Sequence, residues 1–148
     1  MKILAMTVCC MDIYPQQNVT CVGGNSLNFA TQCVRSGIRD VAVLGAIGDD
    51  GHGAAIRKHL VKHNIDVSHL HTRAGSTASS DIYVLETGET HSPDECWRGG
   101  VYQTFRLSHD DWEFARTHDI VAILSVDPNF RECIRQTRPA KLVVDFLD

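Results

Sequence analysis

Four positions near the start of the chain have the chemistry that a polyol ligand needs. They are Asp12, Gly24, Asn25 and Asn28. A carboxylate accepts hydrogen bonds from two adjacent hydroxyls, an asparagine amide both donates and accepts, and the paired glycines 23–24 let backbone N–H groups approach a ligand. The same residues could instead make a tight turn and solvate a helix start. Spacing alone leaves both interpretations open.

Alternating strands and helices would position these residues. Four short, nearly continuous apolar runs are typical of parallel strands that are covered on both faces, and they span 3–10, 41–47, 120–124 and 142–146. Asp12 follows the first run and is predicted to end that strand. Since ligands of open α/β sheets collect at the carboxyl ends of strands, Asp12 is expected at such an edge.

Capping residues and helical spacing predict the helices between these strands. Asn25 or Ser26 can cap the first helix, and Gly37 suits its left-handed end. The second helix is predicted over 50–63, with Ile56, Leu60 and Val61 on its apolar face and Asn64 as its stop. Ser108 is predicted to open the third helix, and the fourth spans 129–136. The predicted fold class is therefore a doubly wound parallel α/β sheet in one domain.

Composition narrows the classes of partner. The chain has 148 residues, 43% of them apolar, and a formal net charge of −4 without a block of like charges. This charge distribution excludes a basic stripe that could bind nucleic acid or an anionic membrane, and it favours a small molecule as the ligand. Six cysteines form no C-x-x-C pair, and the apolar run at the start lacks the features of a signal peptide. We expect reduced thiols and a cytoplasmic protein.

Two longer motifs resemble a known family. V-G-G-N-S-L-N-F-A over 22–30 and L-G-A-I-G-D-D-G-H-G over 44–53, after a strand and an aspartate, are similar to the N-terminal signature of the ribokinase, or PfkB, family of sugar kinases. Asp12-Ile13-Tyr14-Pro15 and the segment 66–72 (D-V-S-H-L-H-T) resemble one branch of it, the fructoselysine 6-kinases. The resemblance extends to Asp145-Phe146-Leu147-Asp148.

The resemblance implies a ribokinase-like αβα sandwich with a small β-sheet lid, of which residues 1–148 are the N-terminal part. It implies that Asp12, Gly24, Asn25 and Asn28 bind the sugar hydroxyls. The segments 14–22 and 80–102 would form the lid, which often serves as a homodimer interface in the family. Arg98 falls where lid residues approach the substrate, although exposed arginines usually only solvate a surface.

The resemblance also says what the 148 residues do not contain. The family's catalytic G-A-G-D motif, whose aspartate takes the proton from the sugar hydroxyl, does not occur in the sequence, and no P-loop replaces it. We therefore assign no catalytic residue, and we expect ATP and Mg²⁺ to be cofactors of the complete enzyme only. Two functions remain open: the sugar-recognising half of a kinase for fructoselysine, a related ketosamine or another fructose-type sugar or nucleoside, and an inactive sugar-binding or dimerising remnant.

Three further features have less specific interpretations. The turn at 48–51 is predicted to be structural, with Asp50 as a helix cap. His59 and His63 stand four residues apart and could share a metal, but no third ligand is apparent, so we predict solvated histidines and no metal site. The stretch 127–131 (D-P-N-F-R) is interpreted as a loop and helix cap.

Overall fold

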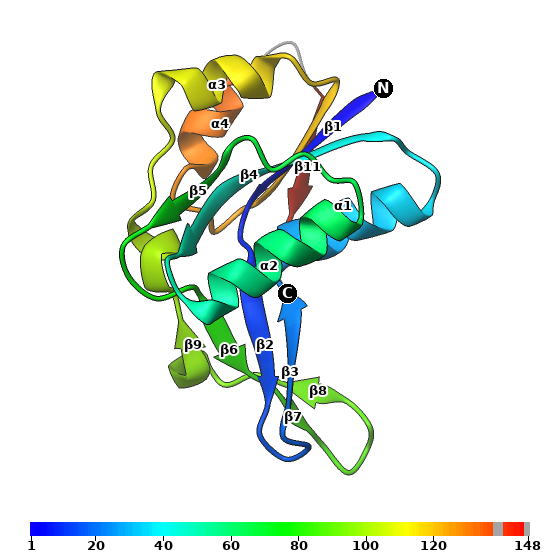
Figure 1. Cartoon of the computed structure of the whole chain (residues 1–148), viewed down its shortest axis with the longest axis vertical. Helices are drawn as coiled ribbons and strands as arrows, with labels where there is room; N and C mark the ends of the chain where they lie inside the picture. Colours follow the sequence, from blue (N-terminus) through cyan, green and yellow to red (C-terminus); the bar gives the residue numbers. More distant parts are fainter. Residues whose placement is uncertain (138–140, 147–148) are drawn as a thin grey trace.

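Five parallel strands form the main sheet of the computed structural model, which describes residues 1–137 and 141–146. The strand order is β11-β10-β1-β4-β5. The strands are β1 (Lys2–Thr7), β4 (Asp40–Gly48), β5 (Leu70–Arg73), β10 (Ile120–Leu124) and β11 (Lys141–Asp145). Figure 1 shows that their carboxyl ends point toward the lower part of the molecule.

Helices cover both faces of this sheet (Figure 1). They are α1 (Asn25–Arg35), α2 (Gly51–Lys62), α3 (His109–Arg116) and α4 (Phe130–Gln136). Consecutive residues of β1 face opposite cores: Ala5 packs with Leu27 of α1 and Ile56 of α2, whereas Leu4 packs with Trp112 of α3. The predicted αβα sandwich is confirmed, because strands that alternate between two apolar cores need helices on each side.

A second, smaller sheet lies beyond the carboxyl ends of the main strands (Figure 1). Its order is β3-β2-β6-β9, and a separate hairpin pairs β7 with β8. These strands are β2 (Cys10–Tyr14), β3 (Val19–Gly23), β6 (Ser79–Asp81), β7 (Tyr83–Val84), β8 (Thr90–His91) and β9 (Trp97–Arg98), with 3₁₀ turns η1 (Asp94–Cys96) and η2 (Gly100–Thr104). The stretches predicted outside the main sheet therefore lie in this second sheet and its hairpin.

The first predicted strand is in fact two strands. β1 ends at Thr7 in the main sheet and β2 begins at Cys10 in the small sheet. The prediction that Asp12 ends the first strand is wrong, because Asp12 lies within β2 and pairs with Cys21 of β3. Residues 8–11 are buried throughout, so the apolar run continues across the break and periodicity cannot reveal it.

Two other predictions need correction. Val61 is 55% exposed, so it does not belong to the apolar face of α2, whereas Ile56 and Leu60 are fully buried. The last predicted strand, β11, is not covered on both faces: it is only half buried, with Val143 44% exposed. Leu147 and Asp148, to which the family resemblance extended, lie outside the described residues.

Three of the predicted helix-end signals are confirmed, and the cap predicted for α1 is wrong. The Asp50 carboxylate caps α2 by accepting a hydrogen bond from the Gly53 N–H at 2.8 Å, and Gly37 adopts a φ of 90° after α1. Ser108 and Asp111 form a reciprocal capping box at the start of α3. Gly24, rather than Asn25 or Ser26, occupies the cap position of α1. Within the described residues, no helix combines the length and apolarity that a membrane crossing needs.

Candidate functional site

A cavity of about 760 Å³ separates the small sheet from the carboxyl ends of β1 and β10. We call it the inter-sheet cavity. It is lined by Val8, Cys10, Asp12, Gly24, Asn25, Asn28, Ser80, Ile82, Ser92, Asp94, Trp97, Tyr102, Gln103, Leu124, Val126 and Pro128. Its volume lies in the range of small-molecule sites, roughly 300–1,000 Å³.

Four of the five residues that the sequence singled out line this cavity. They are Asp12, Gly24, Asn25 and Asn28. They come from β2 and from the start of α1, which the antiparallel pairing of β2 with β3 brings together. The fifth residue, Arg98, is not among the lining residues: its guanidinium pairs with the Asp81 carboxylate at 2.7 Å and donates to the Cys96 carbonyl at 2.8 Å. Arg98 thus stabilises the small sheet in this structure.

The Asp12 carboxylate occupies space that only a glycine at position 23 leaves free. A β-carbon at Gly23 would lie 2.0 Å from Asp12 Oδ2. Burial raises the pKa of Asp12, although a hydrogen bond from the Cys10 thiol, with 3.5 Å between Sγ and Oδ1, opposes this shift. Asp12 is therefore a partly desolvated carboxylate, and such a group forms stronger hydrogen bonds with ligand hydroxyls than one in bulk water.

Gly24 makes the turn from β3 into α1. Its φ of 93° is a conformation that other residues rarely adopt, and a β-carbon there would lie 2.7 Å from the Val8 carbonyl oxygen. This close approach places the first turn of α1, with the side chains of Asn25 and Asn28, at the cavity. Each glycine of the pair is therefore needed for its own reason: Gly23 leaves room for the Asp12 carboxylate, and Gly24 adopts a backbone conformation that other residues rarely adopt.

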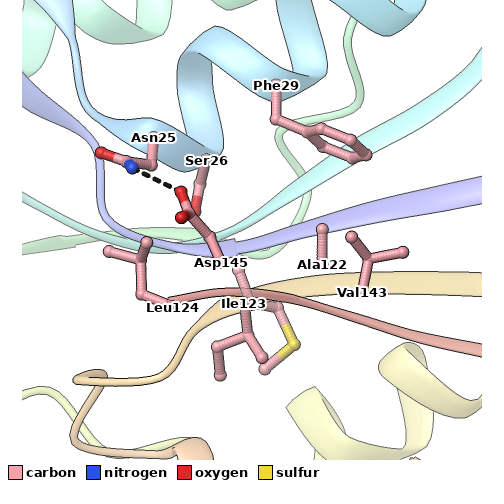
Figure 2. A pocket seen from close by; sticks show the side chains of 9 residues that line it. Asn25, Ser26, Phe29, Ala122, Ile123, Leu124, Val143 and Asp145 are labelled. Carbon is pink, nitrogen blue, oxygen red and sulfur yellow. Dashed lines mark hydrogen bonds between the residues drawn. The ribbon is translucent and has the colours of Figure 1, made fainter. Parts of the chain in front are cut away.

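Asn25 also borders a second, smaller cavity (Figure 2). This cavity of about 70 Å³ lies between α1 and the strands β10 and β11, and Met6, Asn25, Ser26, Phe29, Ala122, Ile123, Leu124, Val143 and Asp145 line it. The Asn25 side-chain amide donates to Asp145 Oδ2 at 2.7 Å (Figure 2). Asp145 was not predicted as part of the site. It lies 120 residues away in sequence, and no local pattern indicates the contact.

A buried polar cluster supports the wall of the inter-sheet cavity. Asp127 Oδ2 accepts from the Tyr102 hydroxyl at 3.1 Å and from the Thr7 hydroxyl, while Oδ1 accepts from the Asn129 N–H at 2.7 Å. Burial raises the pKa of Asp127, and the hydrogen bonds from Asn129 and Tyr102 act in the opposite direction. The interpretation of 127–131 as a loop and helix cap is confirmed in position only: Asn129 occupies the cap position of α4, but its side chain donates to Asp127 and Phe105 and makes no capping hydrogen bond. The sequence did not predict the link to Thr7 and Tyr102.

The part of the cavity lining that comes from the small sheet and its connections mixes polar and apolar side chains. Trp97 of β9 is 39% exposed and packs edge-on against Tyr102, with 6.1 Å between ring centroids. Ile82, between β6 and β7, also lines the cavity, and Asp94 of η1 contributes a carboxylate. The cavity therefore joins a hydrogen-bonding region near α1 to an amphipathic region near β9. The described lining residues include no lysine or arginine.

Comparison with known proteins gives consistent matches. The pattern of the pfkB family carbohydrate kinases matches residues 10–135. The fructoselysine 6-kinases of Escherichia coli (strain K12) and Shigella flexneri are each 36% identical over 115 residues, covering 76% of this chain and 41% of the relative. The chain thus spans about 41% of the length of these curated relatives.

Solved structures show the same fold at low sequence identity. Halothermothrix orenii fructokinase superposes with a TM-score of 0.78 at 13% identity, over 98% of this chain and 57% of that one. Arabidopsis thaliana ribokinase, whose structure contains ribose and ATP, gives a TM-score of 0.76 at 15% identity, over 98% of this chain and 53% of that one. These similarities confirm the ribokinase-like fold, with a parallel main sheet and a small second sheet.

Proposed function

The chain belongs to the pfkB family of carbohydrate kinases, and from this premise we propose that it is the sugar-recognising part of an ATP-dependent kinase for fructoselysine or a related ketosamine. The observation that carries the proposal is the convergence of Asp12, Gly24, Asn25 and Asn28 on one cavity. A carboxylate with two amides offers both acceptors and donors, which is what a chain of neighbouring hydroxyls needs.

The amphipathic half of the cavity supports a ketosamine over a simple sugar. A ketosamine joins a polyol to an amino acid, so it needs polar contacts at one end and contacts for an alkyl chain and an ammonium group at the other. In our proposal the hydroxyls bind near α1, the alkyl chain packs on Ile82 and Trp97, and the Asp94 carboxylate attracts the ammonium group. The 36% identity to the fructoselysine 6-kinases supports the same substrate class.

The residues that line the cavity do not fit the phosphate groups of ATP. Phosphates bind to lysine, arginine or a glycine-rich loop, and the described lining offers acidic and amide side chains instead. The sequence contains neither G-A-G-D nor a P-loop motif. We therefore assign ATP, Mg²⁺ and the transfer of the phosphoryl group to the complete enzyme, and to this chain the binding and orientation of the sugar.

We include in the proposal a lid role for the small sheet and a homodimer formed through it. The sheet covers one side of the inter-sheet cavity, as a lid must. Its two edge strands are β3 and β9, and Val19 at the start of β3 is 46% exposed. An exposed edge with an apolar side chain supports pairing with a second copy.

The experiment is a calorimetric titration of the purified chain with fructoselysine, fructose and ribose, combined with an assay of ATP consumption. We expect fructoselysine to bind most tightly, because only it reaches both halves of the cavity, and we expect no sugar-dependent ATP consumption. Tighter binding of ribose would contradict the ketosamine assignment. Sugar binding without activity even after the chain is joined to the C-terminal part of a fructoselysine 6-kinase would favour the alternative, an inactive sugar-binding remnant.

A further inference from the structure

Two histidines converge on one buried carboxylate outside the proposed sugar site. His69 Nδ1 lies 2.8 Å and His71 Nε2 lies 2.7 Å from the same oxygen, Asp111 Oδ1. His69 directly precedes β5, His71 lies within it, and Asp111 is in the first turn of α3. None of the three lines the inter-sheet cavity. We call these three residues the His-His-Asp cluster.

The histidine spacing has a simple structural origin. Side chains two residues apart in an extended segment point to the same side, so His69 and His71 face α3 while Leu70 between them is buried in the opposite core. The motif D-V-S-H-L-H-T was singled out in the sequence, and the proposed sugar site uses neither histidine.

The cluster is held in place before any ion arrives. The Asp111 side chain is 2% exposed, and its second oxygen, Oδ2, accepts hydrogen bonds from the Ser108 N–H at 2.9 Å and the Ser108 hydroxyl at 2.7 Å. The His69 ring stacks on Phe114, with 3.9 Å between ring centroids. In metal sites, neighbouring groups orient the ligands through hydrogen bonds and packing. Ser108 does this for the Asp111 carboxylate, and Phe114 does it for the His69 ring.

Asp111 presents one oxygen, Oδ1, to both imidazoles, while Ser108 holds the other. The two histidine side chains are 24% and 32% exposed, so an ion can reach the nitrogens from solvent.

We propose that His69, His71 and Asp111 bind a divalent transition-metal ion, with Zn²⁺ as the reference ion and water completing the coordination. All three ligand atoms lie within 4.8 Å of one another. Two imidazoles and one carboxylate are the donor types that zinc accepts, at about 2.0–2.2 Å from each atom. Mg²⁺ and Ca²⁺ prefer all-oxygen sites, so the two imidazoles select against them.

Binding requires a small rearrangement. In a tetrahedral site two ligand atoms stand roughly 3.3 Å apart, so each nitrogen must withdraw from Asp111 Oδ1 by about 0.5 Å. Each ring must also present a lone pair where it now donates an N–H, so its proton moves to the other ring nitrogen through solvent. The bound ion would then join the edge strand β5 to α3 more strongly than the hydrogen bonds do.

The experiment is a titration of the untagged 148-residue chain with Zn²⁺ by calorimetry and with Co²⁺ by visible absorption. All proteins carry Cys21→Ser, which removes the exposed thiol. We expect one ion per chain, a Co²⁺ spectrum without thiolate charge-transfer bands, and no displacement by excess Mg²⁺. Since loss of an outer contact alone costs about 10- to 100-fold in metal affinity, we expect His71→Gln to weaken binding at least tenfold.

His63→Gln is the matched control, because His59 and His63 form the other close histidine pair, with 4.6 Å between ring centroids. It should leave the affinity unchanged. If His71→Gln proves unfolded by circular dichroism, His69→Gln serves in its place, and the Co²⁺ spectrum of the parent chain reports the ligand atoms without any variant. The proposal is overturned by the absence of saturable binding, by thiolate bands, or by equal losses in His63→Gln and His71→Gln. Each readout is independent of sugar binding.

Discussion

The Asp12 carboxylate rests directly on the α-carbon of Gly23, so close that a β-carbon at Gly23 would lie 2.0 Å from Oδ2. The two residues are diagonal neighbours across the antiparallel pair β2 and β3, in which Asp12 pairs with Cys21 and Gly23 with Cys10. Gly23 therefore determines where the carboxylate can lie, whereas Gly24 makes the turn into α1.

Gly23→Ala should displace the Asp12 side chain and weaken sugar binding about as much as removal of the carboxylate does, because the methyl group and Oδ2 cannot occupy the same space. Calorimetric titration with fructoselysine measures the effect. Gly51→Ala is the matched control, since its β-carbon meets nothing within 4 Å and its φ is ordinary. Equal affinities of the two variants would contradict this relationship.

Asp12→Ala should reduce sugar affinity roughly ten- to a hundredfold, which corresponds to about 1.5–3 kcal/mol for a lost charge-assisted hydrogen bond. In an enzyme completed with the C-terminal part, ATP affinity should stay the same. Asp110→Ala, on the exposed side of α3, is the control for removal of a carboxylate. Unchanged sugar affinity in Asp12→Ala would leave Asp12 with a structural role in β2 only.

Sugar binding should also weaken in acid, and it should do so at a higher pH than if Asp12 had the pKa of an ordinary aspartate. Burial raises the pKa of Asp12, so its carboxylate takes up a proton earlier as the pH falls, and a protonated carboxyl no longer accepts from two hydroxyls. Fructoselysine affinity measured against pH should therefore decline with a midpoint above 3.8, the unperturbed value for Asp12. A midpoint at or below that value would count against Asp12 as the acceptor.

Asp111→Asn should destabilise the fold, because it removes the ionised member of the His-His-Asp cluster and half of the capping box of α3. We expect a loss of roughly 1–3 kcal/mol in the free energy of unfolding, measured by urea denaturation. The exposed neighbour Asp110 supplies the control, Asp110→Asn. A loss of similar size in both variants would show that the local charge matters rather than the cluster.

The Asp111 carboxylate also determines in which direction acid changes the stability of the fold. The pKa of Asp111 is lowered from 3.8 to about 2, so its contribution to stability is complete above 3.8 and is lost as the pH falls through about 2. A shift of this size is worth about 2 kcal/mol. The parent chain should lose this stability between pH 4 and pH 2, and Asp111→Asn should lose less over the same interval.

The outer edge of β11 should promote self-association of the 148-residue chain. Within the described residues β11 pairs with β10 alone. Val143 of β11 is 44% exposed, and Phe146, which directly follows the strand, is 68% exposed. An exposed apolar edge strand offers backbone groups to another chain. Sedimentation should show concentration-dependent oligomers, and Val143→Lys should reduce them. A monodisperse monomer with strongly protected amides across 142–146 would contradict the prediction.

Sequence reasoning succeeded where the cause is local. Asp50 and Ser108 cap helices with groups three residues away, and Gly37 ends a helix by its own φ. The four cavity residues Asp12, Gly24, Asn25 and Asn28 were found because they lie in one short stretch of 17 residues, 12–28, that also carries the family motif.

It failed where the cause is distant in sequence. The Asn25–Asp145 and Thr7–Asp127 contacts each join residues 120 positions apart, so no spacing rule reaches them. The division of the first apolar run into β1 and β2 was missed for a different reason. Cys9 and Met11 pack in the same core as Ala5, and Val8 and Cys10 pack in a smaller cluster with Tyr102 and Leu124. All of 8–11 therefore stay buried, and a hydrophobic pattern does not show where the chain changes sheet.

That change of sheet has a mechanical consequence. The chain passes between the sheets through Val8 and Cys9, and it returns through Gly24, whose β-carbon position is 2.7 Å from the Val8 carbonyl. Val8 and Gly24 also form part of the cavity surface. A hinge between the two sheets would therefore run along the surface of the inter-sheet cavity. A ligand in the cavity would contact both sides of that hinge. Occupancy of the cavity and the angle between the two sheets would therefore change together.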